Sequence, residues 1–205
     1  MRANTLSESQ IEAMLAYLST TRHPKRNRLI FLLSSKAGLR AKEIAKLTWW
    51  MTNDSTGQVG WEICLLDSAS KGKSRRRIPL NEDVRNALIE YQEEVLRTGR
   101  PTDMGPSGPL VIQTERSQST SAQAIVNMFQ RWYGHLGFVG CSSHSGRRTF
   151  ITNAARKIST VGRSLRDVQQ LAGHSNLRTT QRYILQTRRR RFVRFRWCEI
   201  SKSAA

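Results

Sequence analysis

Tyr183 stands near a histidine and two arginines, in a segment whose residue types suit phosphate chemistry. His174 comes directly after Gly173, which is typical of a helix that ends in a left-handed C-cap. Arg178 and Arg182 then precede the tyrosine within a second short helix. A tyrosine beside arginines can be a half-buried ring whose hydroxyl contacts water. It can also be a nucleophile, because tyrosine is among the residues that form covalent intermediates.

Arg40 stands where a predicted helix begins, directly after a tight turn at residues 37–39. An arginine at a helix N-terminus opposes the helix dipole unless an anion binds there. Glu43 follows three residues later and therefore shares a helix face with Arg40. The pair is either a structural ion pair or part of an anion-binding site.

His144 and Arg147 are spaced to share the first turn of a helix expected to begin near Ser143. Together they would form an electropositive pocket, although a capping or core histidine has the same spacing. No cluster of His, Cys or carboxylate residues has metal-ligand spacing, so we expect no metal site. The chain also lacks a GxxxxGK[ST] stretch, so nothing indicates ATP, and we expect no cofactor.

A change of hydrophobic period predicts two short strands, at residues 61–66 and 75–80, joined by a turn. Lys71 and Lys73 stand on either side of Gly72, at the exposed tip of this hairpin. The basic tip is either a solvated loop or a flexible cationic group that contacts a phosphate.

The rest of the chain reads mainly as helices, which predicts a mixed, mainly α fold with one small antiparallel β-hairpin. Capping residues or an N1 proline place helix starts at Ser7, Pro24, Asn81, Thr120 and Ser164. We expect the helices from Pro24 and Asn81 to end at Gly38 and Gly99. Residues 99–109, rich in glycine and proline, read as a surface loop or internal linker.

The 205-residue chain has 34 basic and 15 acidic residues, a formal net charge of +19. Such a surplus needs a polyanionic partner, and nucleic acid is favoured over a membrane surface. No apolar run approaches the ~20 residues that span a bilayer, and the first residues lack the apolar stretch typical of a signal peptide. Three widely separated cysteines fit a reducing cytosol. We therefore expect a cytoplasmic protein, in a bacterial cell or on its nucleoid, with no membrane partner.

Taken in order, these motifs resemble the catalytic domain of the tyrosine recombinases (the phage integrase family), from roughly Leu6 to Leu185. The matching segments are Ala37–Glu43, Ser70–Lys73 with Arg77–Leu80, His144–Arg147, Leu171–His174 and Thr179–Tyr183. Each segment alone is a weak signal, whereas the ordered set with the right residue at each active position is a strong one. The resemblance implies that residues 1–185 form the catalytic domain. Residues 186–205 would be a basic C-terminal tail of arginines and aromatic residues.

The chain departs from the family pattern at several places. Gly146 stands where leucine is usual, which slightly weakens the argument from local packing, and Arg148 stands where histidine is common. The N-terminal core-binding domain of the family is expected to be absent, so the chain would be an excised fragment or a natural minimal protein. The arginine and aromatic tail differs from the helix that relatives often dock onto a neighbouring protomer, which puts assembly across protomers in doubt.

The resemblance implies a site-specific DNA recombinase or integrase that uses neither metal nor ATP. Tyr183 would attack a phosphate of double-stranded DNA, and Arg40 and Arg147 would bind its oxygens. Lys71 would protonate the leaving 5′-oxygen. His144 and His174 would bind oxygens or move the tyrosine proton, and Glu43 would support the cluster. Further DNA contacts are expected from Lys73, Arg75, Arg148, Arg178 and Arg182.

The resemblance also implies assembly on DNA as a dimer or tetramer, with a monomer allowed in solution. Two other functions share parts of this description. A type IB topoisomerase-like enzyme would use the same cleavage chemistry as a monomer and without strand exchange. A non-catalytic DNA-binding remnant would occupy and regulate a recombination site.

Overall fold

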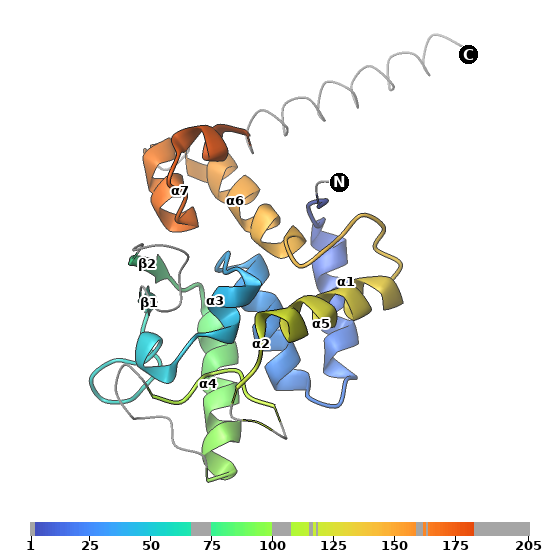
Figure 1. The fold of residues 1–205 in the computed structure, drawn as a ribbon, viewed down its shortest axis with the longest axis vertical. Coiled ribbons are helices and arrows are strands. Elements are labelled where there is room, and N and C mark those ends of the chain that lie inside the picture. Colours follow the sequence, from blue (N-terminus) through green and yellow to red (C-terminus); the bar gives the residue numbers. More distant parts are fainter. Residues whose placement is uncertain are drawn as a thin grey trace. The chain divides into compact units, whose positions relative to one another are not determined.

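The computed structural model describes residues 3–66, 75–99, 108–114, 117, 119–158, 162 and 164–182. The chain divides into two compact units, Met1–Phe150 and Ile151–Ala205, which we call the N-terminal and C-terminal units (Figure 1). The predicted boundary at residue 185 and the tail at 186–205 lie outside the described residues.

Helices and one hairpin make up the N-terminal unit (Figure 1). Its elements are α1 (Glu8–Ser19), α2 (Pro24–Ser35), α3 (Ala41–Ala45), the 3₁₀ turn η1 (Trp49–Met51), β1 (Glu62–Leu65), β2 (Arg76–Pro79), α4 (Glu82–Arg97) and α5 (Ala122–His135). Helix α6 (Ser145–Lys157) begins in this unit and continues into the next. The C-terminal unit also contains α7 (Leu165–Ala172) and a helical segment at 177–182. The predicted fold class, mainly α with a small antiparallel sheet, is confirmed.

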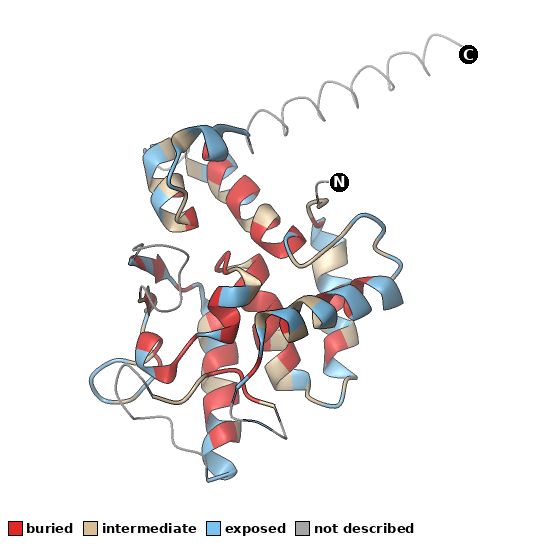
Figure 2. Cartoon of the chain, in the orientation of Figure 1, coloured by how far each residue is buried: buried red, intermediate tan, exposed pale blue. Residues whose placement is uncertain are grey.

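Helix α2 lies at the centre of the N-terminal unit, in contact with α1, α3 and α4. All residues from Leu29 to Leu33 are buried (Figure 2), as expected for a stretch of helix that is apolar on every side. Among the described helices, none is long and apolar enough to cross a lipid bilayer.

Most predicted helix starts are confirmed. Ser7 and Ser164 form capping boxes, and the Asn81 side chain accepts a hydrogen bond from the Val84 amide. The start at Thr120 was wrong by one residue, because Ser121 is the N-cap and accepts from the Ala124 amide at 3.0 Å.

Two other predicted boundaries were also displaced. The helix from Pro24 ends at Ser35 rather than at Gly38, because Lys36 is its C-cap and Gly38, with a φ of +70°, forms the following turn. Helix α6 begins at Ser145, two residues after the expected start. A shift of one or two residues is common at helix ends.

The hairpin is antiparallel, as predicted, with Ile63 opposite Ile78 and Leu65 opposite Arg76. Along β2, Arg76 and Ile78 are buried while Arg77 and Pro79 are exposed. Because successive side chains of a strand point to opposite faces, Arg76 lies on the inner face with Ile78. The hairpin therefore directs an arginine into the unit.

A Gly38→Ala substitution is expected to destabilise the N-terminal unit. Gly38 has a φ of +70°, and a Cβ there would lie 2.3 Å from a ring carbon of Phe150. Left-handed strain and overpacking should together lower the free energy of unfolding by about 2–5 kcal/mol. Denaturant titration measures this change. Gly137→Ala is the matched control, with a φ of +65° and no atom within 4 Å of the added carbon. Equal losses in both variants would contradict the proposed contact with Phe150.

Candidate active site

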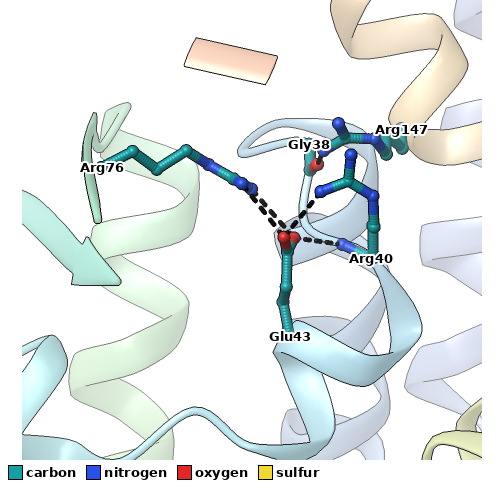
Figure 3. Close-up of polar contacts among 5 residues, drawn as sticks. All are labelled: Gly38, Arg40, Glu43, Arg76 and Arg147. Atoms are coloured by element: carbon teal, nitrogen blue, oxygen red, sulfur yellow. Dashed lines mark hydrogen bonds and ion pairs between the residues drawn. The ribbon is translucent and has the colours of Figure 1, made fainter. Parts of the chain in front are cut away.

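Glu43 is the centre of a cluster of charged side chains (Figure 3). Its side chain is 1% exposed and accepts a hydrogen bond from Nη1 of Arg40 at 2.8 Å. The backbone amide of Arg40, the N-cap of α3, donates to the other carboxylate oxygen at 2.8 Å. The predicted pairing of Arg40 and Glu43 is therefore present, and it fixes both the arginine and the start of α3.

Arg76 is the second partner of Glu43 and was missed by the sequence analysis. Its two terminal nitrogens donate to the two carboxylate oxygens, at 3.0 Å and 2.8 Å (Figure 3). Its side chain is only 5% exposed. The alternation in β2 was the signal that could have found it, because Arg76 shares a strand face with the apolar Ile78 and Leu80.

The surroundings of Glu43 keep its carboxylate ionised. Burial on its own would raise the pKa of Glu43, because it disfavours the charged form. The hydrogen bonds and charge of Arg76, together with those of Arg40, outweigh burial and hold the pKa of Glu43 below its ordinary value.

The lowered pKa of Glu43 predicts acid-sensitive stability. A carboxyl group with a lowered folded-state pKa stabilises the fold above its unfolded-state pKa, and this contribution disappears as pH falls through the folded-state value. Glu43→Gln should therefore reduce stability at neutral pH by about 3–5 kcal/mol. The difference from wild type should shrink as the pH is lowered past the ordinary carboxyl range.

Denaturant titrations from neutral to acid pH measure this effect. Glu62→Gln is the matched control, because Glu62 pairs with Arg77 on the surface and should change stability by less than about 1 kcal/mol. A pH-independent difference between Glu43→Gln and wild type would contradict the lowered pKa.

Arg147 reaches the same turn from α6. It is 5% exposed, and its Nη1 donates to the backbone oxygen of Gly38, two residues before Arg40 (Figure 3). Gly146 allows the first turn of α6 to lie close to α2, because a Cβ there would be 2.5 Å from the Ser34 hydroxyl oxygen. The glycine that departs from the family pattern therefore permits close packing at this point. The fold brings Arg40 and Arg147 together from distant parts of the sequence.

His144 and Arg148 lie at the start of α6 in different surroundings. His144 is exposed, its amide donates to the Ser142 hydroxyl at 3.3 Å, and its carbonyl accepts from the Arg148 amide. Arg148 is partly buried and donates to the backbone oxygen of Ala3 at 2.8 Å. Arg75, another predicted DNA contact, is exposed immediately before β2.

Hydrogen bonds to Gln169 and Thr180 hold His174 within the C-terminal unit. Gly173 is the left-handed C-cap of α7, with a φ of 56°, as predicted. The Gln169 side chain donates to the His174 carbonyl at 2.9 Å, and the His174 amide donates to the Gln169 carbonyl at 3.1 Å. Nδ1 of His174 lies 3.0 Å from the hydroxyl of buried Thr180. These contacts fix the ring and direct Nε2 away from Thr180.

The remaining predicted residues divide into two groups. Arg178 and Arg182 are exposed on the 177–182 helix of the C-terminal unit. Lys71, Lys73 and Tyr183 lie outside the described residues. Within the described part of the chain, no group of three or more His, Cys, Asp or Glu side chains could hold a metal ion.

Comparison with known proteins gives consistent matches along the chain. The model of the phage integrase family matches residues 4–190. Tyrosine recombinase XerD of Xanthomonas axonopodis pv. citri is 33% identical over 190 residues, which cover 89% of this chain and 58% of that protein. Tyrosine recombinase XerA of Thermococcus onnurineus is 28% identical, over 87% of this chain and 57% of that protein. The chain thus spans just over half the length of these curated relatives.

Solved structures share the fold. The XerA recombinase crystal structure has a TM-score of 0.68 at 23% identity, over 89% of this chain and 60% of that one. The Tn1549 transposon integrase in complex with a circular intermediate DNA has a TM-score of 0.65 at 21% identity, over 89% of this chain and 62% of the integrase chain. A lambda integrase dimer bound to a COC′ core site has a TM-score of 0.63 at 18% identity, over 89% of this chain and 59% of the lambda integrase chain.

Proposed function

Because this chain belongs to the phage integrase family, we propose that it is a site-specific recombinase that cleaves and rejoins DNA through Tyr183. The main support for this proposal is that Arg40 and Arg147 converge on one turn. Arg40 is bonded there to Glu43, and Arg147 is bonded to the Gly38 carbonyl. Two fixed guanidinium groups suit a phosphate, because each planar group can bind two oxygens.

In the proposed cleavage step, the phenolic oxygen of Tyr183 attacks a DNA phosphorus atom. A bond forms between tyrosine and phosphorus, the bond to the 5′-oxygen breaks, and the phenolic proton leaves. The products are a 3′-phosphotyrosyl enzyme and a free 5′-hydroxyl. Attack by a 5′-hydroxyl of another strand reverses the chemistry and completes strand transfer. The phosphotyrosyl bond retains the energy of the phosphodiester, so the scheme requires neither ATP nor a metal ion.

In this scheme the arginines stabilise the phosphoryl oxygens. Negative charge develops on these oxygens during attack, and donors that are already in place stabilise it without reorganisation. Arg147 is anchored to Gly38 and Arg40 to Glu43, so neither guanidinium has to be ordered by the substrate.

In the same scheme Lys71 and the two histidines transfer protons. Lys71 would protonate the 5′-oxygen as it leaves. His174, fixed through Nδ1 by Thr180, would direct its other ring nitrogen to a phosphoryl oxygen or to the tyrosine. His144 would serve a similar role at the start of α6.

The proposal also includes the DNA partner, the oligomer and the cellular location of the protein. We propose double-stranded DNA as the partner, held by Lys73, Arg75, Arg148, Arg178 and Arg182, and a dimer or tetramer as the species that assembles on it. Residues 1–185 would act as the catalytic domain, in the cytoplasm of a bacterial cell. The net charge of +19 supports backbone contacts with DNA.

Covalent trapping tests the proposed function. The protein is incubated in EDTA with a randomised pool of nicked duplexes, so that the cleaved fragment diffuses away and religation fails. An adduct that survives boiling detergent is expected, and sequencing its DNA gives the target site. Strand exchange between two marked duplexes then separates a recombinase from a topoisomerase-like enzyme. Salt-sensitive DNA binding without any adduct would overturn the proposal in favour of a non-catalytic DNA-binding protein.

The role of Lys71 gives a separate prediction. A 5′-thio leaving group needs little protonation, so a 5′-thio substrate should restore most of the cleavage that Lys71→Ala loses. The same substrate should restore little in Arg40→Ala, because that variant lacks charge stabilisation rather than an acid. Single-turnover cleavage of matched oxygen and sulfur substrates measures both effects. Equal rescue of the two variants would remove Lys71 from the role of general acid.

A further inference from the structure

Arg76 differs from Arg40 because it is buried together with the carboxylate that both arginines contact. Its side chain is 5% exposed and that of Glu43 is 1% exposed, whereas the Arg40 side chain is 33% exposed. Both terminal nitrogens of Arg76 are directed at the carboxylate of Glu43 (Figure 3). Because both terminal nitrogens of Arg76 donate to Glu43, this geometry does not present them to a DNA backbone. Any effect of Arg76 on catalysis therefore has to pass through Glu43.

Glu43 has two opposing effects on Arg40. Its 2.8 Å hydrogen bond fixes the guanidinium, but its negative charge weakens the attraction between that guanidinium and an anion. Arg40 and Glu43 alone would be formally neutral. Arg76 adds a second positive charge, so the three side chains together carry a formal charge of +1.

We propose that Arg76 is a positioning residue that neutralises Glu43, so that Glu43 anchors Arg40 without cancelling the charge with which Arg40 binds phosphate. The bidentate geometry suits this role, because Arg76 contacts both carboxylate oxygens and draws their charge away from Arg40. The inference rests on the proposed function and explains how its phosphate site stays electropositive. The competing explanation is a buried ion pair that serves the fold alone.

Two variants separate charge from hydrogen bonding. Arg76→Met leaves Arg40 as the one cation bonded to Glu43 among the described residues, which makes this group of side chains formally neutral. The double variant Arg76→Met/Glu43→Gln restores a formal charge of +1. Single-turnover cleavage of a pre-bound nicked duplex should fall about tenfold or more in Arg76→Met, and the double variant should recover most of this loss. DNA affinity should stay within about twofold of wild type, because Arg76 is buried.

A double-mutant cycle with Glu43 tests whether Arg76 acts through that residue. If it does, adding Arg76→Met to Glu43→Gln should change the cleavage rate by less than about twofold, because no buried carboxylate is left to neutralise. Decreases that multiply would assign Arg76 to the fold alone and overturn the proposal. If Arg76→Met does not fold, as judged by near-UV circular dichroism, Arg76→Gln replaces it. Glutamine keeps a hydrogen bond to Glu43 but lacks the charge, so the same tenfold loss is expected.

Phosphate binding provides a readout that does not depend on strand cleavage. The Nε–H resonance of Arg40 is followed by NMR during titration with inorganic phosphate, in wild type, Arg76→Met and the double variant. Arg76→Met should bind phosphate at least about fivefold more weakly than the other two proteins. Equal affinities in all three would overturn the inference. A wild-type protein that binds phosphate in this pattern but forms no DNA adduct would instead contradict the proposed function.

Discussion

A Tyr183→Phe variant is expected to form no covalent adduct with DNA, although it should bind DNA as tightly as the wild-type chain. Phenylalanine keeps the ring and lacks only the hydroxyl oxygen that would bond to phosphorus. Loss of a nucleophile closes the covalent route, so cleavage should fall on the order of 10⁴-fold or more. Affinity should change by less than about twofold, because arginine and lysine contacts to the backbone supply it.

The covalent adduct is measured by incubating each protein with the nicked duplexes and recovering the DNA-linked protein after boiling in detergent. DNA affinity is measured by a salt titration of the same proteins. Tyr17→Phe is the matched control, because Tyr17 is partly buried on α1 and its ring stacks on that of His135, with 4.4 Å between the ring centroids. The Tyr17 variant should form adducts at the wild-type rate. Adducts that persist in Tyr183→Phe would exclude Tyr183 as the nucleophile, and the DNA-linked peptide would then identify the residue that replaces it.

An Arg40→Ala variant is expected to cleave DNA on the order of 10²-fold or more slowly than wild type, because it lacks one preorganised clamp on the phosphoryl oxygens. The choice of Arg40 over Arg147 follows from burial. Arg147 is enclosed and bonded to Gly38, so its loss would also disturb the packing of α6. The Arg40 side chain is one-third exposed, and Glu43 keeps its second partner, Arg76, in the variant.

Single-turnover cleavage of a saturating nicked substrate separates this effect from binding. The rate at saturation should fall while DNA affinity changes little, because the lost contact strengthens in the transition state. Arg131→Ala, an exposed position on α5, is the control for the general loss of one positive charge. A similar decrease in both variants would assign Arg40 to nonspecific attraction of DNA.

Local sequence patterns were sufficient for most secondary structure. The capping boxes at Ser7 and Ser164 and the left-handed cap at Gly173 depend on side chains and backbone preferences within one turn of helix. The hairpin depends on alternation over a few residues. The pairing of Arg40 with Glu43 was also predictable, because their spacing within one helix brings them together.

Errors arose where contacts from distant residues decided the outcome. Gly146 was noted only as a departure from the usual leucine, but it permits a close approach to Ser34, which lies far away in the sequence. The turn at Gly38 was assigned to the end of a helix, whereas it provides space for the Phe150 ring and a carbonyl for Arg147. Neither role is encoded in the neighbouring residues.

The sequence by itself determined the mainly helical fold with one hairpin and the family, because caps, periodicity and ordered motifs are local or require only chain order. Only the tertiary structure decided that Glu43 holds two arginines and that Arg147 is bonded to the turn before Arg40. The physical reason is that a buried carboxylate must be paired. Which of many arginines pairs with it depends on how the hairpin and α3 pack. In a chain with 34 basic residues, composition could not single out Arg76.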